Sequence, residues 1–128
     1  MTSGITFGLD IGTSRTKVIA LDGDGRFLFS EVRATPWTRT TSLPVLDPSD
    51  LFSAVSSLVG RAAARASPRP ILGMGITSIA ETGFLCGEDL IPLAPGRIWY
   101  DSHGSAAAVK YAGDFSEEHF PSVTGLPL

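Results

Sequence analysis

A stretch near the N-terminus, GLDIGTSRTKVIALDGDG, gathers the residue types that hold phosphate groups in proteins. Gly12 lets a ligand approach the backbone closely, because it carries no side chain. Hydroxyl donors follow directly at Thr13, Ser14 and Thr16. Lys17 comes next and adds a positive charge. The spacing therefore predicts a phosphate-binding turn between Gly12 and Lys17.

Asp10 precedes these residues and adds a separate requirement. A carboxylate repels phosphate, so we expect Asp10 to face the phosphates through a Mg²⁺ ion and its water shell. The same residue types also fit an ordinary hairpin turn with a solvated acid at its edge. Residue types alone leave both interpretations open.

The elements around this turn decide how phosphate could be held. Alternation of apolar and polar residues in ITFGLD predicts a strand, TKVIALD predicts a second, and RFLFSEVRA after the DGDG turn predicts a third. A Walker-type loop or a dinucleotide fingerprint requires a helix after the glycine-rich turn. Because a strand is expected here, the remaining possibility is a tight turn whose backbone N–H groups form an anion-binding concavity.

Downstream, TPWTRTTSLPVLDPSD is typical of a polar connection, and Asp47 with Pro48 predicts the start of an amphipathic helix that SPRP ends. We then expect a buried strand at ILGMGITS, a hairpin at GFLCGEDLIP, a short strand at RIWYD and a helix over Ser102–Ala112. The last segment, HFPSVTGLPL, is typical of a loop, and we expect the fold to continue beyond it. The order β-β-β-α-β-β-β-α predicts an α/β fold.

Composition excludes several classes of protein. The 128 residues carry a net charge of −3 without a basic block, which argues against a nucleic-acid partner. Cys86 is the only cysteine, so neither an intrachain disulfide nor a cysteine-based zinc site is possible. No apolar run approaches the roughly 20 residues that span a bilayer, and no signal peptide is evident. We therefore expect a cytoplasmic protein without a membrane partner, with His103 and His119 at its surface.

Three stretches in register resemble the FGGY carbohydrate kinases, a group within the sugar-kinase, heat-shock-protein-70 and actin superfamily. FGLDIGTSRTKVIALD resembles the first phosphate motif, with matches at Asp10, Gly12, Thr13, Ser14 and Lys17. ILGMGITSIAETGFLCGEDLIPLAPGRIWYDSHG resembles the strand, sugar-contact loop, hairpin and Trp-x-Asp segment that follow in the family. VTGLPL resembles the family's Thr-Gly-x-Pro stretch.

The resemblance implies an RNase-H-like, actin-like ATPase fold: a mixed sheet with flanking helices, in a kinase of two domains. Residues 1–128 would form about the first half of the N-terminal domain, with the second domain absent. ATP and Mg²⁺ would bind between the domains, and the sugar would bind against the first. The resemblance places the catalytic base and the adenosine-binding elements outside this chain, so we expect no catalytic residue here. Family members often form homodimers.

The resemblance also implies substrate contacts at Glu81, Thr82 and Asp101. Glycerol kinases have Arg-Glu-Thr where this chain has Ala-Glu-Thr, and the family's Arg two residues after the Asp is replaced here by His103. The alternative for Glu81 is an exposed loop acid. We interpret Trp99 as a core residue rather than a ring that stacks on a ligand.

The resemblance implies an ATP- and Mg-dependent kinase that transfers the γ-phosphoryl group to a hydroxyl of a sugar, polyol or sugar acid, as xylulose, glycerol and gluconate kinases do. We expect this activity of the full-length parent and not of the fragment alone. One alternative is a non-catalytic nucleotide- or sugar-binding module of the same superfamily. Another is a nucleotide-dependent chaperone or filament protein, which the polyol-like loop at Glu81 disfavours.

Overall fold

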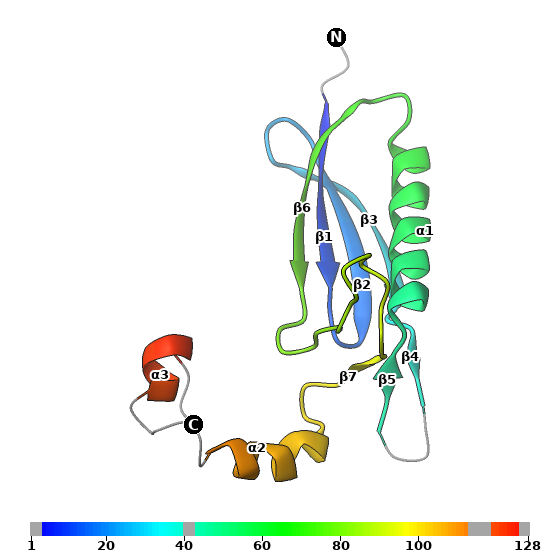
Figure 1. Ribbon diagram of the computed structural model, residues 1–128. Coiled ribbons are helices and arrows are strands. Elements are labelled where there is room, and N and C mark those ends of the chain that lie inside the picture. Colours follow the sequence, from blue (N-terminus) through cyan, green and yellow to red (C-terminus); the bar gives the residue numbers. More distant parts are fainter. Residues whose placement is uncertain (1–3, 40–42, 113–118, 126–128) are drawn as a thin grey trace.

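The computed structural model describes residues 4–39, 43–112 and 119–125. Figure 1 shows the arrangement of its strands and helices. In chain order they are β1 (Ile5–Ile11), β2 (Arg15–Leu21), β3 (Phe27–Ala34), β4 (Trp37–Thr38), β5 (Val45–Leu46), α1 (Pro48–Ala66), β6 (Ile71–Ser78), β7 (Gly96–Arg97), the 3-10 helix η1 (Ser102–Gly104), α2 (Ser105–Ala112) and α3 (His119–Thr124).

The main sheet has the strand order β3-β2-β1-β6. Strands β1, β2 and β3 form the predicted antiparallel meander, and β6 pairs with β1 in parallel. Helix α1 lies alongside this sheet and links the meander to β6 (Figure 1). The sheet is therefore mixed, as predicted, and the α/β class is confirmed.

The DGDG turn between β2 and β3 is confirmed in detail. The Asp22 carboxylate accepts hydrogen bonds from the backbone N–H groups of Asp24 and Arg26, both at 2.9 Å. Gly25 has a φ of 79°, a conformation that glycine adopts without steric strain. The hydrogen bond from the Arg26 backbone, and to a smaller extent that from the Asp24 backbone, lowers the pKa of Asp22, because both favour its ionised form.

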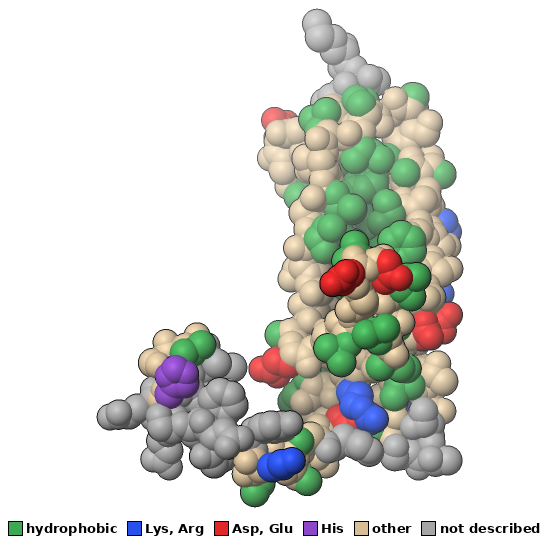
Figure 2. Space-filling view, in the orientation of Figure 1, with side chains coloured by type: hydrophobic (Ala, Val, Ile, Leu, Met, Phe, Trp, Pro, Cys, Tyr) green, Lys and Arg blue, Asp and Glu red, His purple; other side chains and the backbone are tan. Residues whose placement is uncertain are grey.

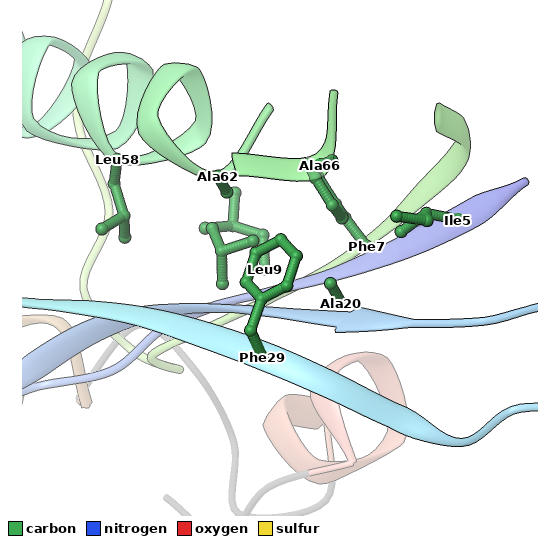
Figure 3. Close-up of a cluster of buried hydrophobic side chains, with 9 residues drawn as sticks. Ile5, Phe7, Leu9, Ala20, Phe29, Leu58, Ala62 and Ala66 are labelled. Carbon is green, nitrogen blue, oxygen red and sulfur yellow. The ribbon is translucent and has the colours of Figure 1, made fainter. Parts of the chain in front are cut away.

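Helix α1 begins as the sequence predicts. The Asp47 carboxylate accepts from the backbone N–H groups of Ser49 at 2.8 Å and Asp50 at 3.3 Å, and Pro48 occupies the first turn, where no N–H partner is required. The buried face of α1 packs against the apolar side chains of the meander (Figure 3). The core residues are Ile5, Phe7, Leu9, Val18, Ala20, Phe29, Leu58, Ala62 and Ala66.

The prediction that ILGMGITS is buried is wrong. Strand β6 exists, but every one of its residues is exposed. Met74 and Ile76 pair in register with Phe7 and Leu9, so they share the sheet face that α1 covers. However, α1 packs against β2 and β3, which leaves apolar side chains uncovered on the β6 side (Figure 2).

Three other expectations need correction. The connection after β3 contains two short strands, β4 and β5, which pair with β7 in a second sheet of order β4-β5-β7. The predicted strand at RIWYD is limited to Gly96–Arg97, where it pairs with β5. The predicted terminal loop contains helix α3, while residues 126–128 lie outside the described residues. The hairpin at GFLCGEDLIP is present, closed by the bridge between Cys86 and Pro92.

Leu58 offers a direct test of the packing between α1 and the sheet. Its side chain is fully buried, whereas Phe52 on the same helix is 75% exposed. We expect Leu58→Ala to lower the free energy of unfolding by about 2–5 kcal/mol, because it leaves a cavity in the core. Phe52→Ala is the matched control and should change it by less than about 0.5 kcal/mol. Urea unfolding followed by circular dichroism measures both, and equal effects would contradict the described packing.

Candidate functional site

The turn between β1 and β2 is tight. The Gly12 N–H donates to the Arg15 carbonyl at 3.0 Å, and the last pair of the ladder is Ile11 with Thr16. A Cβ atom at position 12 would lie 2.9 Å from the Arg15 carbonyl oxygen, which is closer than real Cβ contacts allow. The glycine is therefore required by the turn itself. A strand follows Ser14, and no helix does, as predicted.

The carbonyl groups of this turn accept hydrogen bonds from the segment after β3, which the sequence predicts to be a connection. The Thr35 hydroxyl donates to the Gly12 carbonyl at 2.7 Å, and the Trp37 indole N–H donates to the Thr13 carbonyl at 2.5 Å. The Thr35 backbone N–H donates to the Ser14 carbonyl at 3.1 Å. No sequence motif marks these two residues, because their contact with the turn spans more than twenty positions.

The expectation that Thr16 donates a hydroxyl to phosphate is wrong. Thr16 is fully buried, and its hydroxyl lies 3.3 Å from the Thr35 hydroxyl. Because strand residues alternate between faces, Thr16 points into the protein while Lys17 points out. Thr13 and Ser14 remain at the surface of the turn, half-buried and exposed respectively.

Asp10 and Lys17 lie directly opposite each other in β1 and β2. Leu9 is buried against α1, so the next residue, Asp10, points to the opposite sheet face. Both charged side chains are exposed and, with Thr77, Gly8 and Gly75, line a cavity of about 460 Å³. Over the described residues no ion pair joins them. The structure thus brings Asp10 and Lys17 together on the sheet.

A second cavity, of about 290 Å³, joins the turn to the loop that follows β6. Thr13 lines it from the turn, Glu81 from the loop, and Trp99 from the segment after β7. Trp99 is 55% exposed, so the prediction that it belongs to the core is wrong. Two residues selected for different roles, Thr13 for phosphate and Glu81 for the sugar, therefore face the same cavity.

Glu81 has a φ of 63°, in the left-handed region that favours glycine. A non-glycine residue in this region stores strain of order 1–2 kcal/mol, which persists where the surrounding structure imposes it. Its side chain is exposed. Strained residues of this kind cluster at ligand sites, so the backbone adds an observation that the sequence did not contain.

Thr82 and Asp101 lie in different surroundings from Glu81. The Thr82 hydroxyl is buried and, within the described part of the chain, has no hydrogen-bond partner; it lines a separate cavity of about 290 Å³ beside Ile11 and Leu46. The Asp101 side chain is only 3% exposed and pairs with Arg97 at 2.9 Å. Arg97, which the sequence analysis missed, also faces Glu81 across a cavity of about 310 Å³.

The remaining sequence-based expectations concern the histidines, clusters of metal ligands and membrane-spanning helices. His119 is exposed, as expected, whereas the His103 side chain lies outside what the structure describes. Over the described ranges, no three His, Cys, Asp or Glu side chains come together to bind a metal ion. None of the helices in the described residues is long and apolar enough to cross a membrane.

A family model identifies the family of this chain, and solved structures share its fold. The model of the N-terminal domain of the FGGY family of carbohydrate kinases matches residues 5–128. A glycerol kinase of Rhizorhabdus wittichii is 26% identical over 94% of this chain, which spans 24% of that relative's length. The crystal structure of a xylulose kinase from Rhodospirillum rubrum superposes with a TM-score of 0.79 at 19% identity, over 91% of this chain and 25% of that one. A Plasmodium falciparum glycerol kinase with ADP gives a TM-score of 0.76 at 16% identity, over 93% and 25%.

The strain at Glu81 can be measured with paired substitutions. At an ordinary exposed position, alanine is more stabilising than glycine, because glycine loses more entropy on folding. We expect the reverse order at Glu81, with Glu81→Gly more stable than Glu81→Ala by about 1 kcal/mol, since alanine retains the left-handed strain. Glu88→Gly and Glu88→Ala are the control pair, because Glu88 is exposed and has no positive φ. Thermal unfolding gives the two differences, and the same order at both positions would refute the assigned strain.

Proposed function

Because the chain belongs to the FGGY family of carbohydrate kinases, we propose that it forms the N-terminal portion of a kinase that transfers the γ-phosphoryl group of ATP to a hydroxyl of a sugar, polyol or sugar acid. The observation that carries this proposal is the cavity shared by Thr13 and Glu81. A phosphoryl donor held at the turn and an acceptor held at the loop would meet there, and proximity of this kind supplies much of the catalysis.

The nucleotide side of the proposal rests on the turn. Thr13 and Ser14 would hold the terminal phosphates of ATP through their backbone N–H groups and hydroxyls, and Gly12 would let the phosphates approach the backbone closely. Lys17 would add its charge from the neighbouring sheet face. The presence of ADP in the similar Plasmodium glycerol kinase structure supports nucleotide binding by this fold.

Asp10 is the residue that we propose to hold Mg²⁺. Magnesium in phosphoryl-transfer sites is usually bound by one or two carboxylates, while water and substrate phosphates fill the remaining positions. An exposed carboxylate lining a cavity fits this arrangement, and no described group of three ligands suggests a dedicated protein cage. The chemistry that Mg²⁺ supplies at such a site is neutralisation of charge on the phosphates.

The acceptor side rests on Glu81, with Thr82 and Asp101 as further candidates. A carboxylate accepts strong hydrogen bonds from sugar hydroxyls, and Glu81 is exposed to its cavity. The ion pair of Asp101 with Arg97 favours a role in shaping the segment after β7, beside any contact that its carboxylate makes. The names of the relatives support glycerol or xylulose as the acceptor.

The base that takes the proton from the acceptor hydroxyl would lie outside these residues, and so would the adenosine-binding elements. In this proposal, residues 1–128 supply contacts to the phosphates and the sugar only. The test is to assay the full-length protein that carries these residues with ATP, Mg²⁺ and a panel of glycerol, xylulose, ribulose and gluconate. We expect turnover with one acceptor and none from the chain alone. Turnover by the chain alone would contradict the missing base, and nucleotide or sugar binding without any turnover would favour the non-catalytic module.

Two substitutions in the full-length protein should affect different kinetic constants. We expect Asp10→Asn to lower kcat by about 100-fold or more, because charge stabilisation of the transferring group is lost, with acceptor affinity nearly unchanged. We expect Glu81→Gln to raise KM for the acceptor about tenfold, the effect of one lost charge-assisted hydrogen bond, with KM for ATP nearly unchanged. Steady-state kinetics and calorimetric titration of the acceptor measure these effects.

Asp24→Asn and Glu88→Gln are the matched controls, since both residues are exposed and neither lines the cavities of the proposed site. Both should leave the kinetics unchanged. An acceptor KM that does not respond to Glu81→Gln would remove Glu81 from the site.

A further inference from the structure

We propose that Thr35 and Trp37 are positioning residues that hold the turn of Gly12, Thr13 and Ser14 in the shape that binds phosphate, an inference that rests on the proposed function. All three carbonyl groups of the turn accept hydrogen bonds, and within the described residues every donor belongs to Thr35 or Trp37. The three bonds measure 2.7, 2.5 and 3.1 Å in the order of the carbonyls.

Fixing the carbonyls also fixes the amides. In a planar trans peptide the C=O and the following N–H point in opposite directions. Drawing the carbonyls of Gly12 and Thr13 towards Thr35 and Trp37 therefore turns the N–H groups of Thr13 and Ser14 to the other side. Within the described residues these two N–H groups have no hydrogen-bond acceptor. Adjacent amides aimed the same way make an anion-binding concavity.

The two donors are themselves held firmly. Pro36 stands between them and fixes its own φ, while it restricts Thr35 to extended conformations. Trp37 pairs with the fully buried Leu46 in β5, which in turn pairs with Gly96 in β7. The segment that holds the turn is thus attached to the second sheet, so it can keep the turn in place without a ligand.

The hydroxyl of Thr35 has a defined orientation. It carries one proton, and at 2.7 Å that proton is directed at the Gly12 carbonyl. The Thr16 hydroxyl oxygen lies 3.3 Å from the Thr35 hydroxyl oxygen, so in this pair Thr16 must donate and Thr35 must accept. The resulting chain runs from Thr16 through Thr35 to Gly12, and Thr35 and Thr16 are 5% and 0% exposed. A valine at position 35 would break both bonds.

The experiment compares four variants of the full-length protein. Trp37→Phe keeps an aromatic ring but removes the indole donor. Thr35→Val keeps the side-chain shape but removes the hydroxyl, and Thr35→Ser restores it. Thr38→Val, at an exposed residue of β4, is the matched control. The measurements are calorimetric titration with Mg-ADP, KM for ATP, KM for the acceptor found in the panel, and thermal unfolding.

We expect Trp37→Phe and Thr35→Val to weaken Mg-ADP binding and raise KM for ATP by about five- to tenfold, because each removes one side-chain hydrogen bond to a carbonyl of the turn. KM for the acceptor should change by less than about twofold, an expectation that follows from placing the defect in the phosphate turn. Thr35→Ser and Thr38→Val should bind Mg-ADP as the unmodified protein does. If Thr35→Val fails to fold, Trp37→Phe and Thr35→Ser decide the outcome.

A merely structural role would lower the unfolding temperature of Trp37→Phe while its Mg-ADP affinity stays unchanged, and this result would overturn the inference alone. Failure of the unmodified protein to bind Mg-ADP would overturn the proposed function together with the inference. Titration of the unmodified protein with Mg-ADP therefore distinguishes the two failures.

Discussion

The antiparallel pairing of β1 with β2 is the constraint from which the rest of the site follows. Its ladder continues to Ile11 and Thr16, which leaves four residues, Gly12 to Arg15, to reverse the chain. The register sends Leu9 and Val18 into the core and Asp10 and Lys17 to the opposite face. A shift of one residue would exchange these two sets, so burial of the apolar set also fixes the place of the charged set. Packing against α1 thereby specifies the chemistry on the other face of the sheet.

Features set by neighbouring residues could be predicted from the sequence. The Asp22 turn, the Asp47 cap and the strand alternation of the meander depend on contacts a few positions apart, and each is confirmed. The burial of β6 could not be predicted in this way, because it depends on which elements cover the strand. An apolar run such as ILGMGITS shows only that a strand suits an apolar environment. In this chain α1 reaches β2 and β3, and β6 stays exposed.

The residues of the candidate site also divide into those that a local motif predicts and those that only the fold brings together. The motif that contains Asp10 and Thr13 is contiguous, so its residue types and spacing predict a phosphate-binding turn, with an ordinary hairpin turn as the alternative. Thr35, Trp37 and Arg97 act across long intervals of sequence and carry no motif, so only the fold reveals them. The left-handed backbone at Glu81 is equally invisible in the sequence, because glutamate is an ordinary loop residue. Trp99 was misassigned because a large aromatic residue suits a core and a ligand cavity equally well.

The open side of β6 has a consequence for how the chain behaves in solution. Natural edge strands are commonly blunted by a charged residue, a proline or a short length, and the eight residues of β6 include neither a charge nor a proline. Such an edge is a template on which any extended segment can add a further strand through its backbone. Dilute solutions and low temperature would slow this addition, whereas concentrating the isolated chain would promote the growth of mixed, insoluble sheets.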